Sequence, residues 1–149
     1  MPGLATASLC LISLVSVTPD RYPMLNIDKY LAVRWQMGGR VFPVLDCYGV
    51  VHEVRRDLGL TNWPAFEGVV KEGDEMHTAC NNFRQNVVRC APCPGAVAAC
   101  YTGGVIGHLG VVVELGGLLY VMECNPRRNV TILPLTRFEK QYLKVEYYQ

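Results

Sequence analysis

The clearest pattern in the chain is an apolar stripe that follows Asp46. Four apolar residues recur there at helical spacing: Val50, Val51, Val54 and Leu58. Polar residues fill the opposite face: His52, Glu53, Arg55, Arg56 and Asp57. Asp46 suits the N-cap position, and Gly59 suits the position just after a helix. The pattern therefore predicts a helix that begins at Cys47 and packs its stripe into a core.

The second half of the chain consists of short apolar segments separated by turn residues, a pattern typical of strands. The predicted strands are an apolar segment around 97–99, His108–Glu114, Leu118–Cys124, Asn129–Leu133 and Leu143–Tyr148. Gly116-Gly117 marks a hairpin turn. Short helices are expected around residues 30–33, within 67–89 and over 136–142. Together these elements predict an α+β fold with an antiparallel sheet of about four to six strands.

Length and composition set limits on this interpretation. The chain has 149 residues, half of them apolar, which is enough for one domain with a sizeable core. A net charge of +1 gives no reason to expect a nucleic-acid partner. No apolar run reaches the length of a membrane span, so no stable membrane insertion is expected. Residues 1–23 are apolar with interspersed Ser and Thr and resemble a signal segment without its basic start. We expect them to form an N-terminal extension or arm, or else an element packed on a domain of residues 24–149.

The cysteine count is high for this length. Seven cysteines cannot all pair internally, and free thiols from a reducing compartment are the simpler interpretation. Cys90 and Cys93 form a close pair, with Cys80 and Cys100 nearby. Zinc or an iron–sulfur cluster usually takes two close pairs, and only one is present, so a metal site stays an alternative. A redox dithiol is less favoured, because the pair does not open a helix.

Cys47 is the first candidate for chemistry. Free N–H groups and the positive dipole end at a helix start favour a thiolate and can hold an oxyanion. Such a cysteine is a candidate nucleophile if a base can reach it, and otherwise a small buried apolar residue. His108, at the start of a predicted strand, is the candidate base. It can equally be a structural histidine.

The predicted hairpin offers partners for the second nitrogen of the His108 ring. A two-residue turn at Gly116-Gly117 pairs His108 with Asn125 and places Glu123 diagonally on the same face. By chemistry, a carboxylate or an amide is the better group to orient an imidazole.

The order of these motifs resembles the NlpC-type cysteine peptidases, the bacterial and phage branch of the papain-like fold. Their signature is Asp-Cys-x-Gly at the start of a helix, followed later by His-x-Gly at the start of a strand. Phage tail-tip members also carry Gly-Gly-Arg shortly before the cysteine. The matching segments are Gly38-Gly39-Arg40, Asp46-Cys47-Tyr48-Gly49-Val50-Val51 and Gly107-His108-Leu109-Gly110. The resemblance covers roughly residue 24 to the C-terminus and implies a papain-like α+β fold.

The resemblance also implies an activity. It implies a peptidoglycan endopeptidase that cuts an amide in the stem peptide without a metal or another cofactor. Cys47 would be the nucleophile and His108 the base, with support at the first helical turn from Asp46. Ungapped spacing places Tyr120 where most relatives carry a third, histidine residue, so Tyr120 is the first expectation and Glu123 and Asn125 are its alternatives. Trp35 stands where relatives have an active-site aromatic, usually Tyr, and it can also be a core residue.

A tail-tip member would be made in the host cytoplasm, reside in the virion and act at the host cell wall. Its partners would be the stem peptide and other tail-tip proteins. Three positions depart from the family pattern: Trp35, Tyr120 and Ala96, which replaces the usual Asp of a Pro-x-Pro-Gly-Asp turn. These departures favour an alternative function, a structural tail-tip or tail-assembly subunit with weak or lost activity. Intact Cys47 and His108 favour the peptidase.

Overall fold

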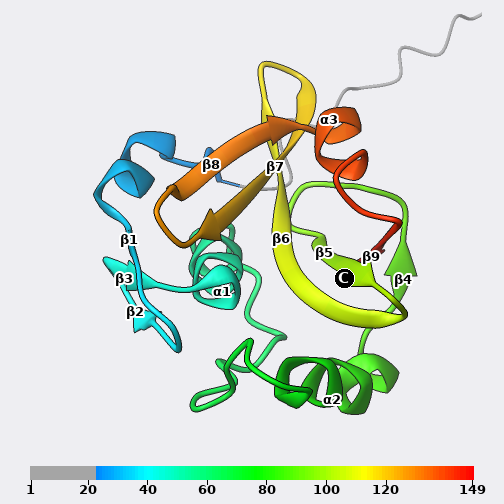
Figure 1. Ribbon diagram of the computed structural model, residues 1–149. Helices are drawn as coiled ribbons and strands as arrows, with labels where there is room; N and C mark the ends of the chain where they lie inside the picture. Colours follow the sequence, from blue (N-terminus) through cyan, green and yellow to red (C-terminus); the bar gives the residue numbers. More distant parts are fainter. Residues whose placement is uncertain (1–22) are drawn as a thin grey trace, which may run out of the picture.

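The computed structural model describes residues 23–149, which form a mixed α+β fold (Figure 1). The expected extension of residues 1–23 lies outside the described residues except for Pro23, so the boundary at residue 24 stays a prediction. The elements in chain order are η1 (Ile27–Ala32), β1 (Arg34–Trp35), β2 (Arg40–Val41), β3 (Val44–Leu45), α1 (Cys47–Asp57), α2 (Glu75–Phe83), η2 (Arg84–Asn86), β4 (Arg89–Cys90), β5 (Val97–Thr102), β6 (Val105–Leu115), β7 (Leu118–Asn125), β8 (Asn129–Pro134), α3 (Leu135–Glu139) and β9 (Lys144–Tyr148).

A six-stranded sheet in the order β4-β9-β5-β6-β7-β8 dominates the fold, and every neighbouring pair in it is antiparallel. This confirms the predicted antiparallel sheet. The central strand β6 is strongly curved, so one face of the sheet is concave (Figure 1). The predicted two-residue turn is also confirmed, because Leu115 pairs with Leu118 across Gly116 and Gly117. Both glycines have positive φ, as a tight hairpin turn of this length requires.

A second, three-stranded sheet was not predicted. Its order is β1-β3-β2, with β1 parallel and β2 antiparallel to β3. Each strand has only two residues, which is too short for an alternating pattern to be visible in the sequence. β3 leads directly through Asp46 into α1, so this small sheet fixes where the helix begins.

The two faces of the six-stranded sheet bury different apolar clusters. On one face α1 packs with Val50, Val51 and Val54 against a cluster that includes Leu109, Val111 and Val113 of β6: these six residues are at most 3% exposed. On the other face α3 inserts Phe138 against a smaller cluster that includes Val112. Successive residues of a strand face opposite sides, so odd and even residues of β6 serve different faces. We call these faces the α1 face and the α3 face.

The polar side of α1 is more buried than the sequence predicts. Glu53 and Arg55 are buried, whereas an outward face was expected for both. Glu53 accepts a hydrogen bond from Lys29 at 2.6 Å and pairs with Arg56, and the Arg55 guanidinium donates to the Gly95 carbonyl and to Asn62. Long-range ionic and carbonyl partners stabilise these buried charges, and helical periodicity carries no trace of such partners.

Residues 61–86 form a cover beside the α1 face. The expected short helix within 67–89 is α2. It lies apart from α1, next to the curved part of β6 (Figure 1). The cover is anchored by edge-to-face aromatic contacts, with ring centroids 5.1 Å apart for Trp63 and Phe83 and 5.5 Å apart for Phe66 and Phe83. Phe66 in turn packs on Tyr48 of α1 at 5.1 Å. The cover is thus tied to the helix that carries Cys47.

Candidate functional site

The start of α1 is fixed by one ionic network. The Asp46 carboxylate accepts hydrogen bonds from the backbone N–H of Gly49 at 2.8 Å, as an N-cap should, and from that of Gly38 at 3.0 Å. It also pairs with the Arg40 guanidinium at 2.6 Å. Arg40 donates as well to three carbonyl groups at the base of the cover, those of Ala65, Phe66 and Val69. The Gly-Gly-Arg and Asp-Cys motifs therefore form a single unit that positions Cys47.

Two glycines allow the backbone segments of this unit to approach closely. A Cβ on Gly39 would lie 2.6 Å from the Val44 carbonyl oxygen. A Cβ on Gly49 would collide with the carbonyl oxygen of Gly39. Neither glycine has an unusual φ, so the requirement for glycine is one of space.

Cys47 lies at the first turn of α1 and is 3% exposed. Burial raises the pKa of its thiol to about 11, and the Asp46 charge adds to this, while Lys71, the Leu109 backbone N–H and Arg40 act in the opposite direction. The expectation that the helix start favours a thiolate is therefore wrong for this resting state. Desolvation outweighs the dipole, and the sulfur keeps its proton at neutral pH.

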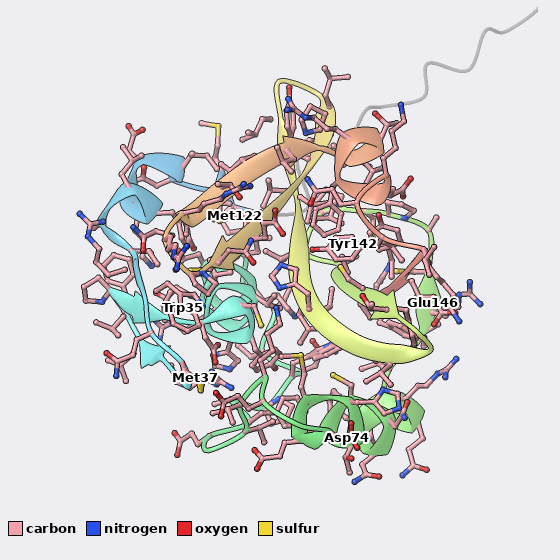
Figure 2. The ribbon with its side chains drawn as sticks, in the orientation of Figure 1. Trp35, Met37, Asp74, Met122, Tyr142 and Glu146 are labelled. Atoms are coloured by element: carbon pink, nitrogen blue, oxygen red, sulfur yellow. The ribbon has the colours of Figure 1, made fainter. Side chains whose placement is uncertain are left out.

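His108 lies on the α3 face and is also 3% exposed. Its Nε2 lies 2.7 Å from Oε2 of Glu123 on the neighbouring strand β7. The ring stacks on Tyr142, with planes 16° apart and centroids 6.1 Å apart. Figure 2 shows Tyr142 on the side of β6 that faces away from α1. The other ring nitrogen, Nδ1, is buried and has no hydrogen-bond partner.

The state of Glu123 determines which ring nitrogen carries the proton. Burial is the largest influence and acts to raise the pKa of Glu123, whereas the hydrogen bonds that its carboxylate makes with His108, Asn125 and Thr131 act to lower it. The net pKa lies below the ordinary value, so Glu123 is ionised at neutral pH and accepts a hydrogen bond from Nε2–H. Nδ1 of a neutral His108 then holds a free lone pair, which is what a general base needs.

β6 and β7 are not paired along their whole length. The ladder between these two strands runs from the Gly116-Gly117 turn only to Val111 and Met122. Val112 donates its N–H toward the β5 side, to the carbonyl of Ala96 just before that strand, at 2.9 Å. Successive N–H groups of a strand point in opposite directions, so the N–H of Leu109, three residues earlier, faces the β7 side. There it hydrogen-bonds the Cys47 sulfur. The sulfur thus enters the split between the strands, next to the residue that follows His108.

The third residue differs from the first expectation. Tyr120 pairs with Val113, five residues along β6 from His108 and therefore about 16 Å away at ordinary strand spacing. Glu123 occupies the position against the ring, as the alternative based on hairpin register proposed. Asn125 supports Glu123 and does not pair with His108, because the ladder ends before reaching them. The correction has a simple reason: a two-residue turn fixes the register, and ungapped family spacing does not.

Trp35 lies on β1, is half-buried and packs against the core of the α1 face. Its backbone N–H donates to the Asn129 side chain at 2.9 Å, which joins the small sheet to the β7–β8 turn. This placement fits the core interpretation. A role for the indole N–H at an oxyanion stays a prediction.

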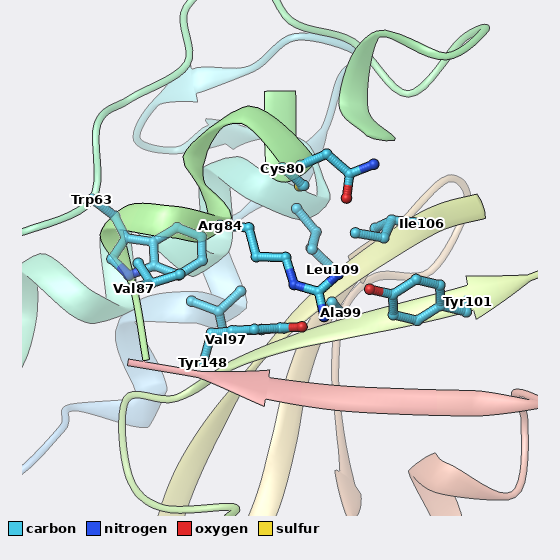
Figure 3. A pocket seen from close by; sticks show the side chains of 11 residues that line it. Trp63, Cys80, Arg84, Val87, Val97, Ala99, Tyr101, Ile106, Leu109 and Tyr148 are labelled. Carbon is cyan, nitrogen blue, oxygen red and sulfur yellow. The ribbon is translucent and has the colours of Figure 1, made fainter. Parts of the chain in front are cut away.

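Two small cavities lie between the cover and the sheet. The larger, of about 20 Å³, is mostly apolar and is crossed by the Arg84 side chain between Trp63 and Tyr101 (Figure 3). The smaller, of about 10 Å³, lies toward Arg40 and Tyr48. Both are lined by Leu109 and by Cys80 of α2, so both border the strand residue that contacts the Cys47 sulfur.

His77 of α2 was expected to be exposed, but it is half-buried and makes a long-range contact. Its Nδ1 accepts the backbone N–H of Ile106 at 3.1 Å, two residues before His108. This bond fastens the cover to β6. No local sequence signal reveals it, because it joins residues 29 positions apart.

The metal alternative has no cluster to support it in the part of the chain that the structure describes. Among residues 23–149, no three or more His, Cys, Asp or Glu side chains gather in a way that could hold a metal ion. Cys80 lies on α2, whereas Cys100 is buried on the α3 face. Of the helices within the same residues, none is long and apolar enough to cross a membrane.

Comparisons with known proteins add no family to this description. A scan against protein-family models gives no match. A search among curated proteins gives no match either. What this site can do chemically therefore follows from its own geometry. A buried thiol at a helix start contacts the N–H of Leu109, and the preceding residue, His108, has one ring nitrogen bound to a carboxylate and the other without a partner.

Proposed function

We propose that the protein is a cysteine peptidase of the NlpC type, which hydrolyses an amide bond in the peptidoglycan stem peptide. One observation carries the proposal. His108 has one ring nitrogen bound to the ionised Glu123 and the other buried without a partner. The next residue in the chain contacts the Cys47 sulfur through its N–H. An unpaired buried nitrogen costs folding free energy, and a base that accepts the thiol proton explains why it is kept.

The proposed fold is papain-like. Three features support it: the candidate nucleophile opens a helix, that helix packs on β6 and β7 of an antiparallel sheet, and the candidate base lies on β6. The Gly-Gly-Arg, Asp-Cys-x-Gly and His-x-Gly motifs all take part in positioning these two residues. Ala96, in contrast, is a fully buried small residue in the smaller cluster.

The first step is a proton transfer. Because the thiol pKa is about 11, Cys47 is a poor nucleophile until a base removes its proton. Nδ1 of His108 takes that proton, and the resulting imidazolium is stabilised by the Glu123 carboxylate through Nε2–H. The two groups lie on opposite faces of the sheet at rest, so this transfer requires a rearrangement that brings the sulfur from the Leu109 N–H to Nδ1.

The later steps follow the chemistry of thiol acyl transfer. The sulfur attacks the amide carbonyl, and the backbone N–H of Cys47 at the helix start stabilises the oxyanion. His108 gives its proton to the leaving amine, which departs and leaves a thioester on Cys47. His108 then takes a proton from water, the hydroxide adds to the thioester, and the sulfur leaves as the carboxylate product is released.

Access to the site requires the cover to move. Cys47 and His108 are each 3% exposed, and a polymer substrate cannot reach groups buried to this extent. The cover is fastened at its base by Arg40 and on α2 by the bond from Ile106 to His77. We place the opening between α2 and β6, because the two small cavities already separate them there.

The biological setting that we propose is the one that the resemblance to phage tail-tip proteins implies. The enzyme would reside in the virion at a phage tail tip, where it is assembled with other tail-tip proteins after synthesis in the host cytoplasm. It would thin the wall locally for DNA entry. Neither nucleic acid nor membrane is needed as a partner.

The test compares three proteins on purified peptidoglycan: the full chain, Cys47→Ala and Cys93→Ala. Cys93 is a matched control, since it is a thiol far from the α1 start in the fold. We expect muropeptide release from the full chain and from Cys93→Ala, and at least about 10³-fold less from Cys47→Ala. Mass spectrometry of the released fragments identifies the cleaved bond. Equal release from the full chain and Cys47→Ala, or none from any protein, would contradict the enzyme.

A second candidate function is a structural tail-tip subunit that keeps the fold without the activity. The burial of both Cys47 and His108 favours it, because a site that never opens performs no hydrolysis. The two candidates differ in the same assay, since the structural subunit releases no fragments even when it is added to peptidoglycan in excess.

A further inference from the structure

A second pair of sulfur atoms lies at the edge of the sheet, away from the proposed site. Cys90 is the last residue of β4, and Cys93 follows after Ala91 and Pro92. Both are free thiols and half-buried. The two thiols interact directly, because the Cys93 side chain hydrogen-bonds Cys90.

The backbone that follows Cys90 holds the two thiols in place. The Cys93 carbonyl accepts the N–H of Ala96 at 3.0 Å, and the N–H of Gly95 donates to Val112 of β6 at 2.8 Å. Gly95 has a φ of +84°, a backbone conformation that favours glycine. β4 is anchored in turn, because Cys90 pairs with Tyr147 of β9. Bringing the sulfurs together therefore costs little additional chain ordering.

The surroundings of the pair suit reaction with a small polar molecule. The side chain N–H of Gln149 donates to the Cys93 sulfur at 3.1 Å. Gln149 also lines an open groove of about 370 Å³, together with Arg55, Asn62, Pro94 and Gly95. The groove is large enough for a small polar molecule to approach the pair.

The other thiols in residues 23–149 are less suited to oxidation. Cys47, Cys100 and Cys124 are buried, so a dissolved oxidant reaches them poorly. Cys80 is half-buried and lies against the cavities under α2. None of these is in hydrogen-bond contact with another thiol. Access and proximity thus single out Cys90 and Cys93.

We propose that Cys90 and Cys93 are a redox modification site, which small-molecule disulfides convert to an intramolecular disulfide while Cys47 stays reduced.

In the first exchange, the Cys93 thiol loses its proton, and its sulfur attacks one sulfur of the oxidant. One thiol equivalent leaves, and a mixed disulfide forms. In the second exchange, the Cys90 sulfur, after losing its proton, attacks Cys93 and releases the second thiol. The protein loses two electrons and two protons, and the oxidant becomes two thiols. This inference does not depend on the proposed peptidase activity.

The experiment uses the full chain, purified reduced and then equilibrated with mixtures of oxidised and reduced glutathione. After remaining thiols are blocked, the protein is cut after Arg89 and Tyr101, and the peptide of residues 90–101 is weighed. We expect this peptide to lose the mass of two hydrogen atoms and to regain it with excess reduced glutathione. Cys90→Ser and Cys93→Ser should each abolish the loss and leave a glutathione adduct on the remaining cysteine. The matched control Cys80→Ser should behave as the unaltered chain does.

Three outcomes would overturn the proposal. The first is a glutathione adduct on the unaltered chain with no internal disulfide. The second is loss of the two hydrogen atoms that persists in Cys90→Ser and Cys93→Ser. The third is oxidation of Cys47 at a lower ratio of oxidised to reduced glutathione than the pair requires.

Discussion

The two faces of the six-stranded sheet treat their reactive groups in opposite ways. On the α1 face, Cys47 is surrounded by apolar side chains, and its thiol is uncharged at neutral pH. On the α3 face, His108 is held between the ionised Glu123 and the stacked ring of Tyr142. The chain thus keeps the proposed nucleophile, as a neutral thiol, and the proposed base on opposite sides of one sheet.

This difference shows what the split in the sheet provides. If β6 and β7 had continued to pair, the N–H of Leu109 would donate to a strand partner on β7 and would not be free for the Cys47 sulfur. Because the ladder ends at Val111 and Met122, the sulfur takes that N–H. The resting state is therefore an uncharged thiol bound to the Leu109 N–H, with the imidazole of His108 on the opposite face. The predictions below test this distinction.

The largest expected effect concerns the alkylation of Cys47. Because burial raises its pKa to about 11, only the small thiolate fraction reacts, and that fraction grows tenfold per pH unit below the pKa. The alkylation rate of Cys47 with iodoacetamide, followed by mass spectrometry, should rise about 10³-fold from pH 7 to pH 10. A rate that stays flat over this range would mean that the thiolate is already formed, and the contrast between the faces would disappear.

The second prediction separates Glu123 from Tyr120. Glu123→Gln removes the charge that fixes the tautomer of His108, and we expect kcat/KM on a stem-peptide substrate to fall about 10²- to 10³-fold. Tyr120→Phe, opposite Val113, should stay within about twofold of the unaltered chain. Thermal unfolding of both variants verifies that they fold. A large loss in Tyr120→Phe with little change in Glu123→Gln would reverse the assignment.

The fold was largely predictable because its elements follow from local patterns. The stripe after Asp46 and the stop at Gly59 locate α1 well, and the glycine turn fixes the register of β6 and β7. The predicted closing strand and the short helix around residue 138 are also present, with ends shifted by one to three residues. The small sheet escaped prediction because its strands are too short to show a period.

The candidate site was predictable only in part. Cys47 was visible because a helix start is a local feature. His108 was expected at the start of a strand, but it lies inside β6, which begins at Val105. The raised pKa of Cys47 depends on how much of the chain covers it, and sequence carries no direct record of burial. Glu123 was reached by register and chemistry, and it competed with a family spacing that ignored the turn. The contact of His77 with Ile106 joins distant segments and left no signal.

The third prediction concerns the network that holds the α1 face together. Arg40→Ala leaves the buried carboxylate of Asp46 without its cation and three carbonyl groups without their donor. We expect the free energy of unfolding to fall by about 3 kcal/mol. Arg34→Ala is the matched control, since Arg34 is exposed and donates only to nearby carbonyls, and it should cost less than about 0.5 kcal/mol. Urea denaturation measures both, and similar losses would show that Arg40 is not the anchor.

The smallest expected effect concerns how the α1 face tolerates a buried charge. Glu146 is surrounded by Tyr148, Tyr101, Lys144 and Arg89, and the Tyr148 hydroxyl is the main reason that its pKa falls to about 2. Its contribution to stability is therefore complete above the unfolded pKa of about 4.5 and is lost as the pH falls toward 2.

Glu146→Gln should lower the free energy of unfolding by roughly 1–2 kcal/mol at pH 6. The loss is no larger because water screens the charges of the exposed cations around Glu146. The difference from the unaltered chain should shrink as the pH falls from 6 to 3, as denaturation at each pH would measure. The pKa of Glu123 is also lowered, so Glu123→Gln should remove a separate part of the same acid sensitivity. A difference between Glu146→Gln and the unaltered chain that is constant over this range would show that Glu146 does not titrate with folding.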